Sequence, residues 1–188
     1  PPKMDAQTRL QVLENLRAQD NPALKDIITA FEAESQAAHL DPNLKTMLDF
    51  LDQIGIGWRF GTVPVGTFLP GLEVVGGTIV MDQTKLKYPG DILHEAGHIA
   101  LVPLEKRPSF SGNVAETLPE HSGDEVGVIL WTYAACLHLG LPLDYVIHDE
   151  GYHDNADWLR EQFAARTFIG LPLLVWMGLC EDPVKAKA

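Results

Sequence analysis

The sequence is poor in the residues that build covalent frameworks or membrane anchors. Its 188 residues include two cysteines, Cys136 and Cys180, too few for a disulfide scaffold. Both lie in apolar stretches, where cysteine usually packs as a small hydrophobic residue, although a single bridge between them stays open. The longest apolar run, FIGLPLLVWMGLC, is too short to span a bilayer and contains a proline. These shortages argue against a disulfide-rich module and against a membrane-spanning segment.

Basic residues are also scarce. Lysine and arginine total 14 against 26 aspartates and glutamates, which gives a net charge of -12. Because this charge repels phosphate backbones and anionic lipids, we expect neither nucleic acid nor a membrane surface as a partner. No signal peptide is recognisable, although a chain that begins Pro1-Pro2 leaves room for a processed N-terminus. We therefore expect a cytoplasmic protein, of an oligomeric state that the sequence leaves open.

The periodicity of the chain changes at Gly55. Residues 1–54 predict two or three amphipathic helices without a chemical motif. Beyond Gly55, β-branched residues and glycine predict strands, including a hairpin that turns at Gly76-Gly77. Further helices are predicted over these ranges: about 90–101, 124–139, 143–148 and 156–167.

The expected fold is α+β, with a small, mostly antiparallel sheet beside the helices over 90–101 and 124–139. Residues 1–54 would form an N-terminal helical segment packed on a core of residues 55–188, the two together making one domain. A hydrophobic content of 46% is enough for a sizeable core. The apolar C-terminal stretch LPLLVWMGL and all four tryptophans are expected in that core: Trp58, Trp131, Trp158 and Trp176.

The stretch YPGDILHEAGHIALVP, residues 88–103, places His94, Glu95 and His98 on a predicted helix. Residues four apart share a helix face, so both imidazoles can bind one metal while Glu95 reaches a water beside it. Zinc lowers the pKa of such a water to about 7, and a carboxylate can pass its proton to a leaving group. The three positions match by chance in about one chain of this length in a hundred. Gly97, in mid-helix, indicates that another segment passes close by or that space is needed near the metal.

A catalytic zinc needs a third protein ligand. The metzincin pattern, with a histidine six residues after His98, is absent because position 104 is leucine. Glu125 opens a strongly apolar predicted helix, where an unpaired carboxylate would be costly, and metal ligation would remove that cost. Its alternative role is compensation of the helix dipole. Other side chains of the same stretch remain possible ligands: Glu120, His121 and Asp124.

The pattern His94-Glu95-x-x-His98, followed by Glu125 on a second helix, resembles the gluzincin zinc metallopeptidases, particularly their short single-domain members. The resemblance covers about residues 72–135. It implies that His94, His98 and Glu125 hold Zn²⁺ and that Glu95 is the general base. It also implies that the strand GTIVMD is an edge strand above the cleft, to which peptide substrates add as a further strand. On this resemblance we predict a zinc-dependent peptidase that acts on a peptide or protein substrate.

The chain departs from the family pattern at Ile129, where many gluzincins carry an aspartate four residues after the glutamate ligand. The hydrogen bonds around the ligands must therefore differ. Family enzymes also stabilise the oxyanion with a downstream tyrosine or histidine. The stretch VIHDEGYHDNADW offers Tyr152 and His148 as first choices and His153 as third. Ordinary loop residues, helix caps or a second metal site are the alternatives for these three.

Two hypotheses from other classes remain open. The protein could bind zinc without catalysis, as a regulatory or interaction module on a peptidase-like fold. It could also be a metal-free structural domain in which the motif is accidental. Two histidines and one carboxylate are also the ligand set of non-haem iron oxygenases, but the helical spacing with an embedded glutamate favours zinc.

Overall fold

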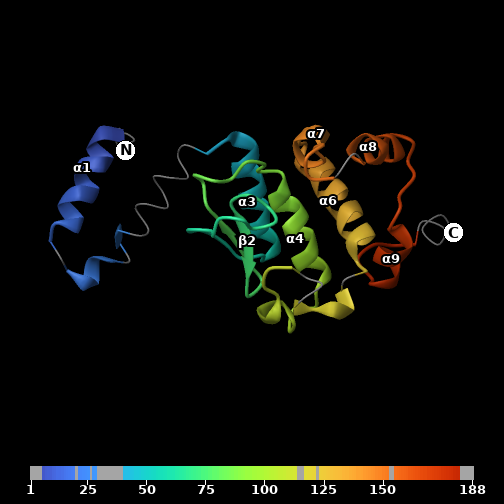
Figure 1. The fold of residues 1–188 in the computed structure, drawn as a ribbon, viewed down its shortest axis with the longest axis horizontal. Helices are drawn as coiled ribbons and strands as arrows, with labels where there is room; N and C mark the ends of the chain where they lie inside the picture. Colours follow the sequence, from blue (N-terminus) through green and yellow to red (C-terminus); the bar gives the residue numbers. More distant parts are fainter. Residues whose placement is uncertain are drawn as a thin grey trace. The chain divides into compact units, whose positions relative to one another are not determined.

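The structure, a computed structural model, describes residues 6–19, 21–25, 27–28, 40–113, 117–121, 123–152 and 155–182. Contacts divide the chain into two compact units, residues 1–45 and 46–188. The first holds the helix α1 (Ala6–Arg17) and the short 3₁₀ turn η1 (Pro22–Leu24) (Figure 1). Asn21 caps η1, because its side-chain oxygen accepts a hydrogen bond from the Ala23 amide at 3.0 Å.

The helix α3 (Pro42–Ile54) begins with proline in its first turn, as predicted. Asp41 precedes it and accepts a hydrogen bond from the Asn43 amide at 2.7 Å. Met47, Leu48 and Leu51 are buried along one side of this helix. Most of α3 therefore belongs to the second unit, although the sequence analysis grouped it with the N-terminal segment.

The sheet has three strands: β1 (Trp58–Phe60), β2 (Leu72–Val75) and β3 (Thr78–Met81). Their order is β1-β3-β2, with β1 parallel to β3 and β2 antiparallel to it. The fold is thus α+β, but the sheet is mixed rather than mostly antiparallel, because the chain crosses over between β1 and β3. The hairpin is confirmed: Gly76 and Gly77 join β2 to β3 with φ angles of 58° and 72°, which glycine adopts without strain.

The edge strands are β1 and β2, and this corrects the expectation that GTIVMD, which forms β3, lies at an edge. The β3 strand lies in the middle, with the Ile79 amide bonded to Gly57 on one side and the Asp82 amide bonded to Gly71 on the other. Both distances are 2.9 Å. A strand bonded on both sides has no free edge for a substrate, so strand addition could occur only at β1 or β2. Of these two strands, β2 lines the groove described below.

The predicted helix with the histidine motif is α4 (Asp91–Leu101), and the next long helix is α6 (Glu125–Leu139). These two lie side by side (Figure 1). Gly140 ends α6 in the left-handed conformation, as its position predicted. Between and after them lie shorter elements: η2 (Arg107–Ser109), η3 (Pro119–His121), α7 (Leu143–Val146), α8 (Ala156–Ala164) and α9 (Leu171–Trp176). The described part of the chain contains no helix long and apolar enough to cross a membrane.

The C-terminal helices contribute less to the core than the sequence predicted. Trp158 is 47% exposed and Trp176 is 80% exposed, so neither is a core anchor. Of α9, only Leu174 is buried. The helices α8 and α9 are short, which lets each bury one side only. Both cysteines are free.

Candidate metal centre

The two motif histidines project from one side of α4. The opposite side of the helix is buried through Ile92, Leu93 and Ile99. Since the buried positions recur every three to four residues, the same period directs His94 and His98 together toward a groove. The hydrophobic pattern that folds α4 therefore also aligns the two imidazoles.

Close packing of α4 on α6 brings the third side chain to them. A Cβ atom on Gly97 would lie 3.0 Å from Val128 Cγ1 and 3.2 Å from Thr132 Oγ1, which leaves little room for any larger residue. The Thr132 hydroxyl also donates to the carbonyl of Leu93 at 3.4 Å. The expectation that a segment passes close to Gly97 is confirmed, and that segment carries Glu125 in its first turn.

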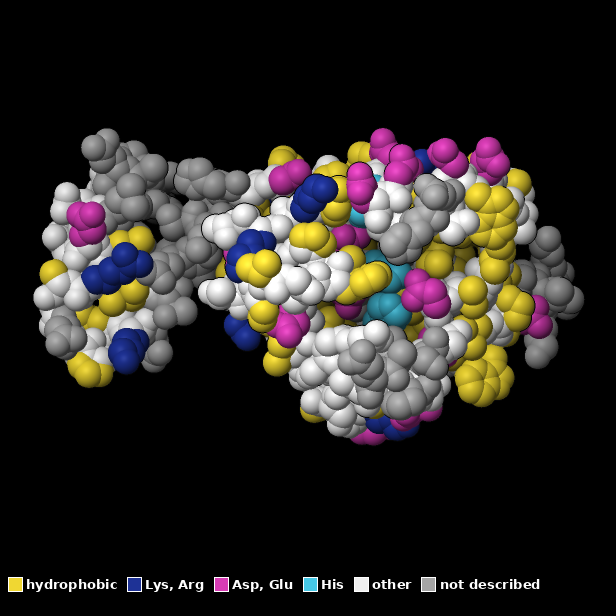
Figure 2. All heavy atoms as spheres, in the orientation of Figure 1, with side chains coloured by type: hydrophobic (Ala, Val, Ile, Leu, Met, Phe, Trp, Pro, Cys, Tyr) yellow, Lys and Arg dark blue, Asp and Glu magenta, His cyan; other side chains and the backbone are white. Residues whose placement is uncertain are grey.

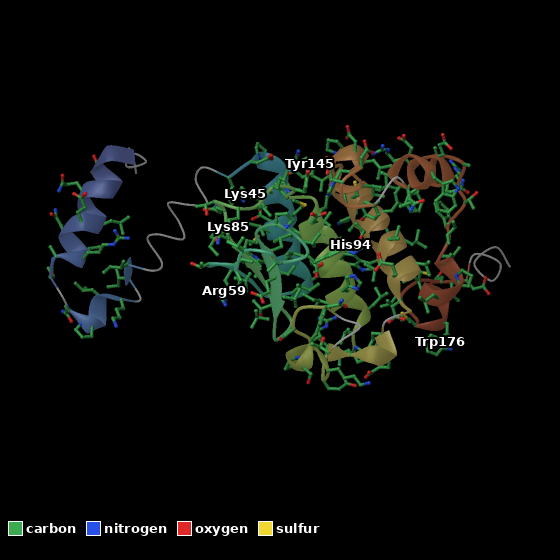
Figure 3. All side chains as sticks on the ribbon, in the orientation of Figure 1. Lys45, Arg59, Lys85, His94, Tyr145 and Trp176 are labelled. Atoms are coloured by element: carbon green, nitrogen blue, oxygen red, sulfur yellow. The ribbon has the colours of Figure 1, made fainter. Side chains whose placement is uncertain are left out.

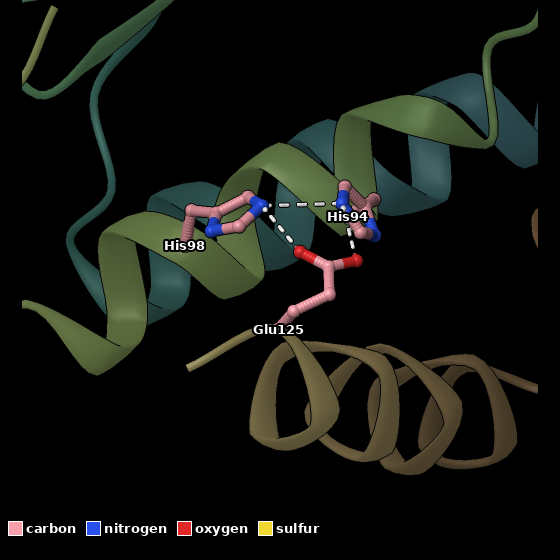
Figure 4. Close-up of side chains that lie close together, drawn as sticks. All are labelled: His94, His98 and Glu125. Atoms are coloured by element: carbon pink, nitrogen blue, oxygen red, sulfur yellow. Dashed lines mark hydrogen bonds and ion pairs between the residues drawn. The ribbon is translucent and has the colours of Figure 1, made fainter. Parts of the chain in front are cut away.

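His94, His98 and Glu125 converge on one point (Figure 4). The two Nε2 atoms lie 3.2 Å apart. One carboxylate oxygen of Glu125 is 3.6 Å from His94 Nε2, and the other is 3.4 Å from His98 Nε2. This is the one cluster of metal-ligating side chains found among the described residues.

Both imidazoles are neutral at physiological pH. Burial lowers the pKa of His94 to about 3, with the neighbouring His98 and His148 adding to the effect. Burial also lowers the pKa of His98 to about 4, although Asp124 opposes the shift. A neutral imidazole has a lone pair that can bind a metal ion. His94 and His98 therefore do not have to lose a proton before they bind a metal.

Glu95 lines the same groove, and its carboxyl group is largely withdrawn from solvent. Burial raises its pKa to about 8, and the carboxylates of Asp91 and Glu125 contribute to the rise. Both protonation states of Glu95 are therefore accessible near neutral pH. A divalent cation beside it would favour the ionised form.

Tyr152 and His148 both lie near the cluster, in different roles. The Tyr152 hydroxyl is 3.3 Å from His94 Nδ1, the ring nitrogen that points away from Glu125. His148 has both ring nitrogens engaged: Nε2 is 2.8 Å from Asp91 Oδ1, and Nδ1 accepts a hydrogen bond from the Gly151 amide at 3.1 Å. The third candidate, His153, is outside the described residues.

The alternative ligands Glu120, His121 and Asp124 are paired with residues outside the histidine cluster. Glu120 pairs with Lys106 at 2.9 Å on the surface. His121 Nδ1 is 2.7 Å from Asp124 Oδ2, and this pair flanks the start of α6. The structure thus brings Glu125, and neither Glu120 nor the His121–Asp124 pair, into the histidine cluster.

The cluster lies in a groove of about 660 Å³, between α4, β2 and the loop before β2. Histidine side chains are visible at its base, with an acidic side chain beside them (Figure 2). The described lining of the groove contains no lysine or arginine. It contains four carboxylates: Glu73, Asp91, Glu95 and Glu125.

Phe68 and Asp91 are two of the lining residues that sequence reasoning missed. Phe68, in the loop before β2, is 85% exposed at the rim and had no periodic pattern to mark it. Asp91 could have been found, since it stands three residues before His94 and so shares its side of the helix.

No protein-family model, curated protein or solved structure matches this chain. The functional argument therefore depends on the geometry and chemistry of the groove itself.

Proposed function

We propose that this protein is a zinc-dependent hydrolase that cleaves peptide bonds. The observation that supports it best is the convergence of two neutral imidazoles and one carboxylate in an open groove, next to a fourth side chain able to carry protons. His94 is seen on α4 within the sheet-and-helix part of the molecule (Figure 3).

The donor set fits zinc in kind and spacing. Nitrogen atoms about 2.0 Å from a tetrahedral zinc lie about 3.3 Å from each other. The 3.2 Å between the Nε2 atoms, and the 3.4 and 3.6 Å from each to Glu125, are close to that separation. Three protein ligands leave a fourth position for water or substrate. Two histidines and a carboxylate also suit iron, so the metal itself must be measured.

Zinc held there would polarise the substrate carbonyl and make a water acidic near pH 7. Glu95 then acts as the general base that takes a proton from the attacking water and returns it to the leaving amine. Without a cation nearby its pKa is raised to about 8, and zinc would favour the ionised form, which is the form that can take the proton. Tyr152 lines the groove with its hydroxyl 3.3 Å from His94 Nδ1, and donation to the oxyanion would require that hydroxyl to turn away from His94 toward the substrate.

The edge of β2 supports a peptide as substrate. The Leu72 amide bonds to Leu69 at 3.1 Å, and the Val74 carbonyl accepts from the Gly112 amide at 2.8 Å. Because backbone groups alternate along a strand, the remaining outward groups at the groove are the Leu72 carbonyl and the Val74 amide. One residue of an extended substrate can pair with these two groups, because its own N–H can donate to the Leu72 carbonyl and its own C=O can accept from the Val74 amide.

The first test is metal content by elemental mass spectrometry of protein purified without chelators. We expect about one zinc per chain in the wild type, loss in Glu125→Ala, and retention in the surface control Glu120→Ala. A metal-free wild type after zinc is added back would overturn the proposal, and one iron per chain would redirect it to oxygenase chemistry.

The second test is turnover of a fluorogenic peptide library by the zinc-loaded wild type and by Glu95→Gln. Activity that depends on Glu95 supports hydrolysis. Full zinc occupancy with no turnover by the wild type over a broad library would favour a zinc-binding regulatory module instead.

A further inference from the structure

The two ring nitrogens of His94 have different neighbours. Nε2 faces Glu125 and His98, and Nδ1 lies 3.3 Å from the Tyr152 hydroxyl. A histidine that binds a metal through Nε2 carries its hydrogen on Nδ1 and usually donates it to an outer group, which fixes the plane of the ring. Tyr152 stands where that acceptor is required, and only 9% of its surface is exposed.

Tyr152 is held in place by the residues just before it. His148 Nδ1 accepts a hydrogen bond from the Gly151 amide at 3.1 Å, so the ring hydrogen belongs on Nε2. That nitrogen donates to Asp91 Oδ1 at 2.8 Å. Asp91 is buried in the first turn of α4, the helix that carries His94. A continuous path of contacts thus runs from Asp91 through His148 and Gly151 to Tyr152.

The turn is packed too tightly to shift easily. A Cβ atom on Gly151 would lie 2.9 Å from His148 Cε1 and 3.3 Å from Asp91 Oδ1, so no other residue fits without movement. The His148 ring also stacks on Tyr88, with 4.4 Å between ring centroids. The imidazole is therefore held at both ring nitrogens by hydrogen bonds and on one face by Tyr88.

We propose that Asp91 is a positioning residue of the metal centre: through His148 and the Gly151 amide it holds the Tyr152 hydroxyl behind His94. This inference rests on the proposed metal site. It also accounts for Ile129, which stands where the resemblance to gluzincins led us to expect an aspartate. In this chain the residue that accepts a hydrogen bond from the ligand His94 is Tyr152, which lies at the end of the 148–152 turn.

The test is titration of the apo-protein with Co²⁺, followed by visible absorption and by competition with a chelator. Asp91→Ala should weaken metal binding by about 10- to 100-fold and change the ligand-field bands of bound Co²⁺. Asp91→Asn keeps an oxygen that can accept from His148 Nε2, so it should stay within about 3-fold of the wild type. Glu73→Ala, which removes another carboxylate of the same groove, is the matched control and should bind as the wild type does.

Tyr152→Phe supplies an independent arm. It should weaken metal binding as Asp91→Ala does. The affinity of the double variant for metal should equal that of the single variant with the lower affinity, because both changes break the same path. If Asp91→Ala does not fold, by circular dichroism, then Asp91→Asn and Tyr152→Phe carry the test. The inference would be overturned if the losses of metal affinity in the two single variants added up in the double variant. It would also be overturned if either Asp91→Ala or Tyr152→Phe bound metal with the affinity and spectrum of the wild type. Either result would leave the proposed function standing. A wild type that binds no Co²⁺ or Zn²⁺ would overturn the inference together with the proposed function.

Discussion

The Nε2 atoms of His94 and His98 lie 3.2 Å apart. With both rings neutral, one Nε2 can donate a hydrogen to the other, or both can give their lone pairs to one ion. Glu125 faces the same point, and its carboxylate charge is compensated far better by a cation than by a neutral ring. On the proposed function, we therefore expect a divalent ion bound at this point to stabilise the folded protein.

Zinc should raise the melting temperature. At a free concentration about 100 times Kd, binding adds about 2.7 kcal/mol to the free energy of unfolding. For a chain of this size the melting temperature should rise by roughly 5–10 °C. Differential scanning fluorimetry of wild type, Glu125→Ala and Glu120→Ala would measure it. An equal rise in Glu125→Ala would mean that the third ligand is another residue.

Glu95→Gln should separate metal binding from catalysis. The amide keeps the shape of the side chain but cannot take a proton, so we expect zinc content to persist and kcat to fall by about 10²- to 10⁴-fold. Glu73→Gln is the control, because Glu73 lines the groove from β2 and has no part in the proposed proton transfer. Unchanged kcat in Glu95→Gln would remove the general-base assignment.

Gly97→Val should harm both folding and metal binding. Its branched side chain would press on Val128 and Thr132 and separate α4 from α6, at a cost of about 1–3 kcal/mol. The carboxylate of Glu125 would then move away from the histidines. Urea denaturation and metal titration would be compared with Ala134→Val, at an exposed position of α6, which should change neither by much. Wild-type metal affinity in Gly97→Val would show that the helix spacing is not critical.

Asp82→Asn should destabilise the protein in a pH-dependent manner. Asp82, 8% exposed, accepts hydrogen bonds from Thr84 and pairs with Lys85, and these contacts lower its pKa far below the ordinary value of 3.8. A lowered pKa means that the unfolded chain binds the proton first as pH falls. The stability gained from the charge is therefore complete above about pH 5 and declines below pH 3.8.

The measurement is the difference in melting temperature between wild type and Asp82→Asn from pH 7 to pH 2. It should be largest at neutral pH and shrink as the solution becomes acidic. Glu105→Gln, in the exposed turn after α4, should show little difference at any pH. A difference for Asp82→Asn that grows on acidification would contradict the assigned contacts.

Peptides that carry lysine or arginine next to the scissile bond should be cleaved faster than those that carry glutamate. The groove contributes carboxylates, and its described lining contains no lysine or arginine to neutralise them. We expect about 3- to 10-fold higher kcat/KM for the basic peptides at low ionic strength, with the ratio falling as salt is added. A ratio that does not respond to salt would assign the preference to shape instead of charge.

The elements that could be predicted are those with a local signal. The helix spacing of His94 and His98, the glycine pair of the hairpin and Gly140 after α6 each act over a few residues, and the structure has them as expected. Strand order has no local signal. Nothing in the sequence near β3 says that β1 will pair with it in parallel, so the edge was assigned to the wrong strand.

The contacts behind the candidate ligands could not be predicted from the sequence, because they too have no local signal. Asp91 and His148 are 57 positions apart and meet only because α4 and the 148–152 turn pack together. Trp176 looked like a core residue from its apolar neighbours, yet hydrophobicity alone does not say which side of a short helix is covered.

The Phe110–Gly112 segment, bonded along the second half of β2, also has a consequence for solubility. An uncovered strand edge is a template on which other copies of a chain can pair. The amides of Gly76, Gly77 and Gly112 are all used in bonds between the hairpin and this segment. Pairing between β2 strands of two molecules is therefore limited to the short stretch that faces the groove. We expect this arrangement to limit aggregation through β2 while leaving room for the one extended peptide that the proposed function requires.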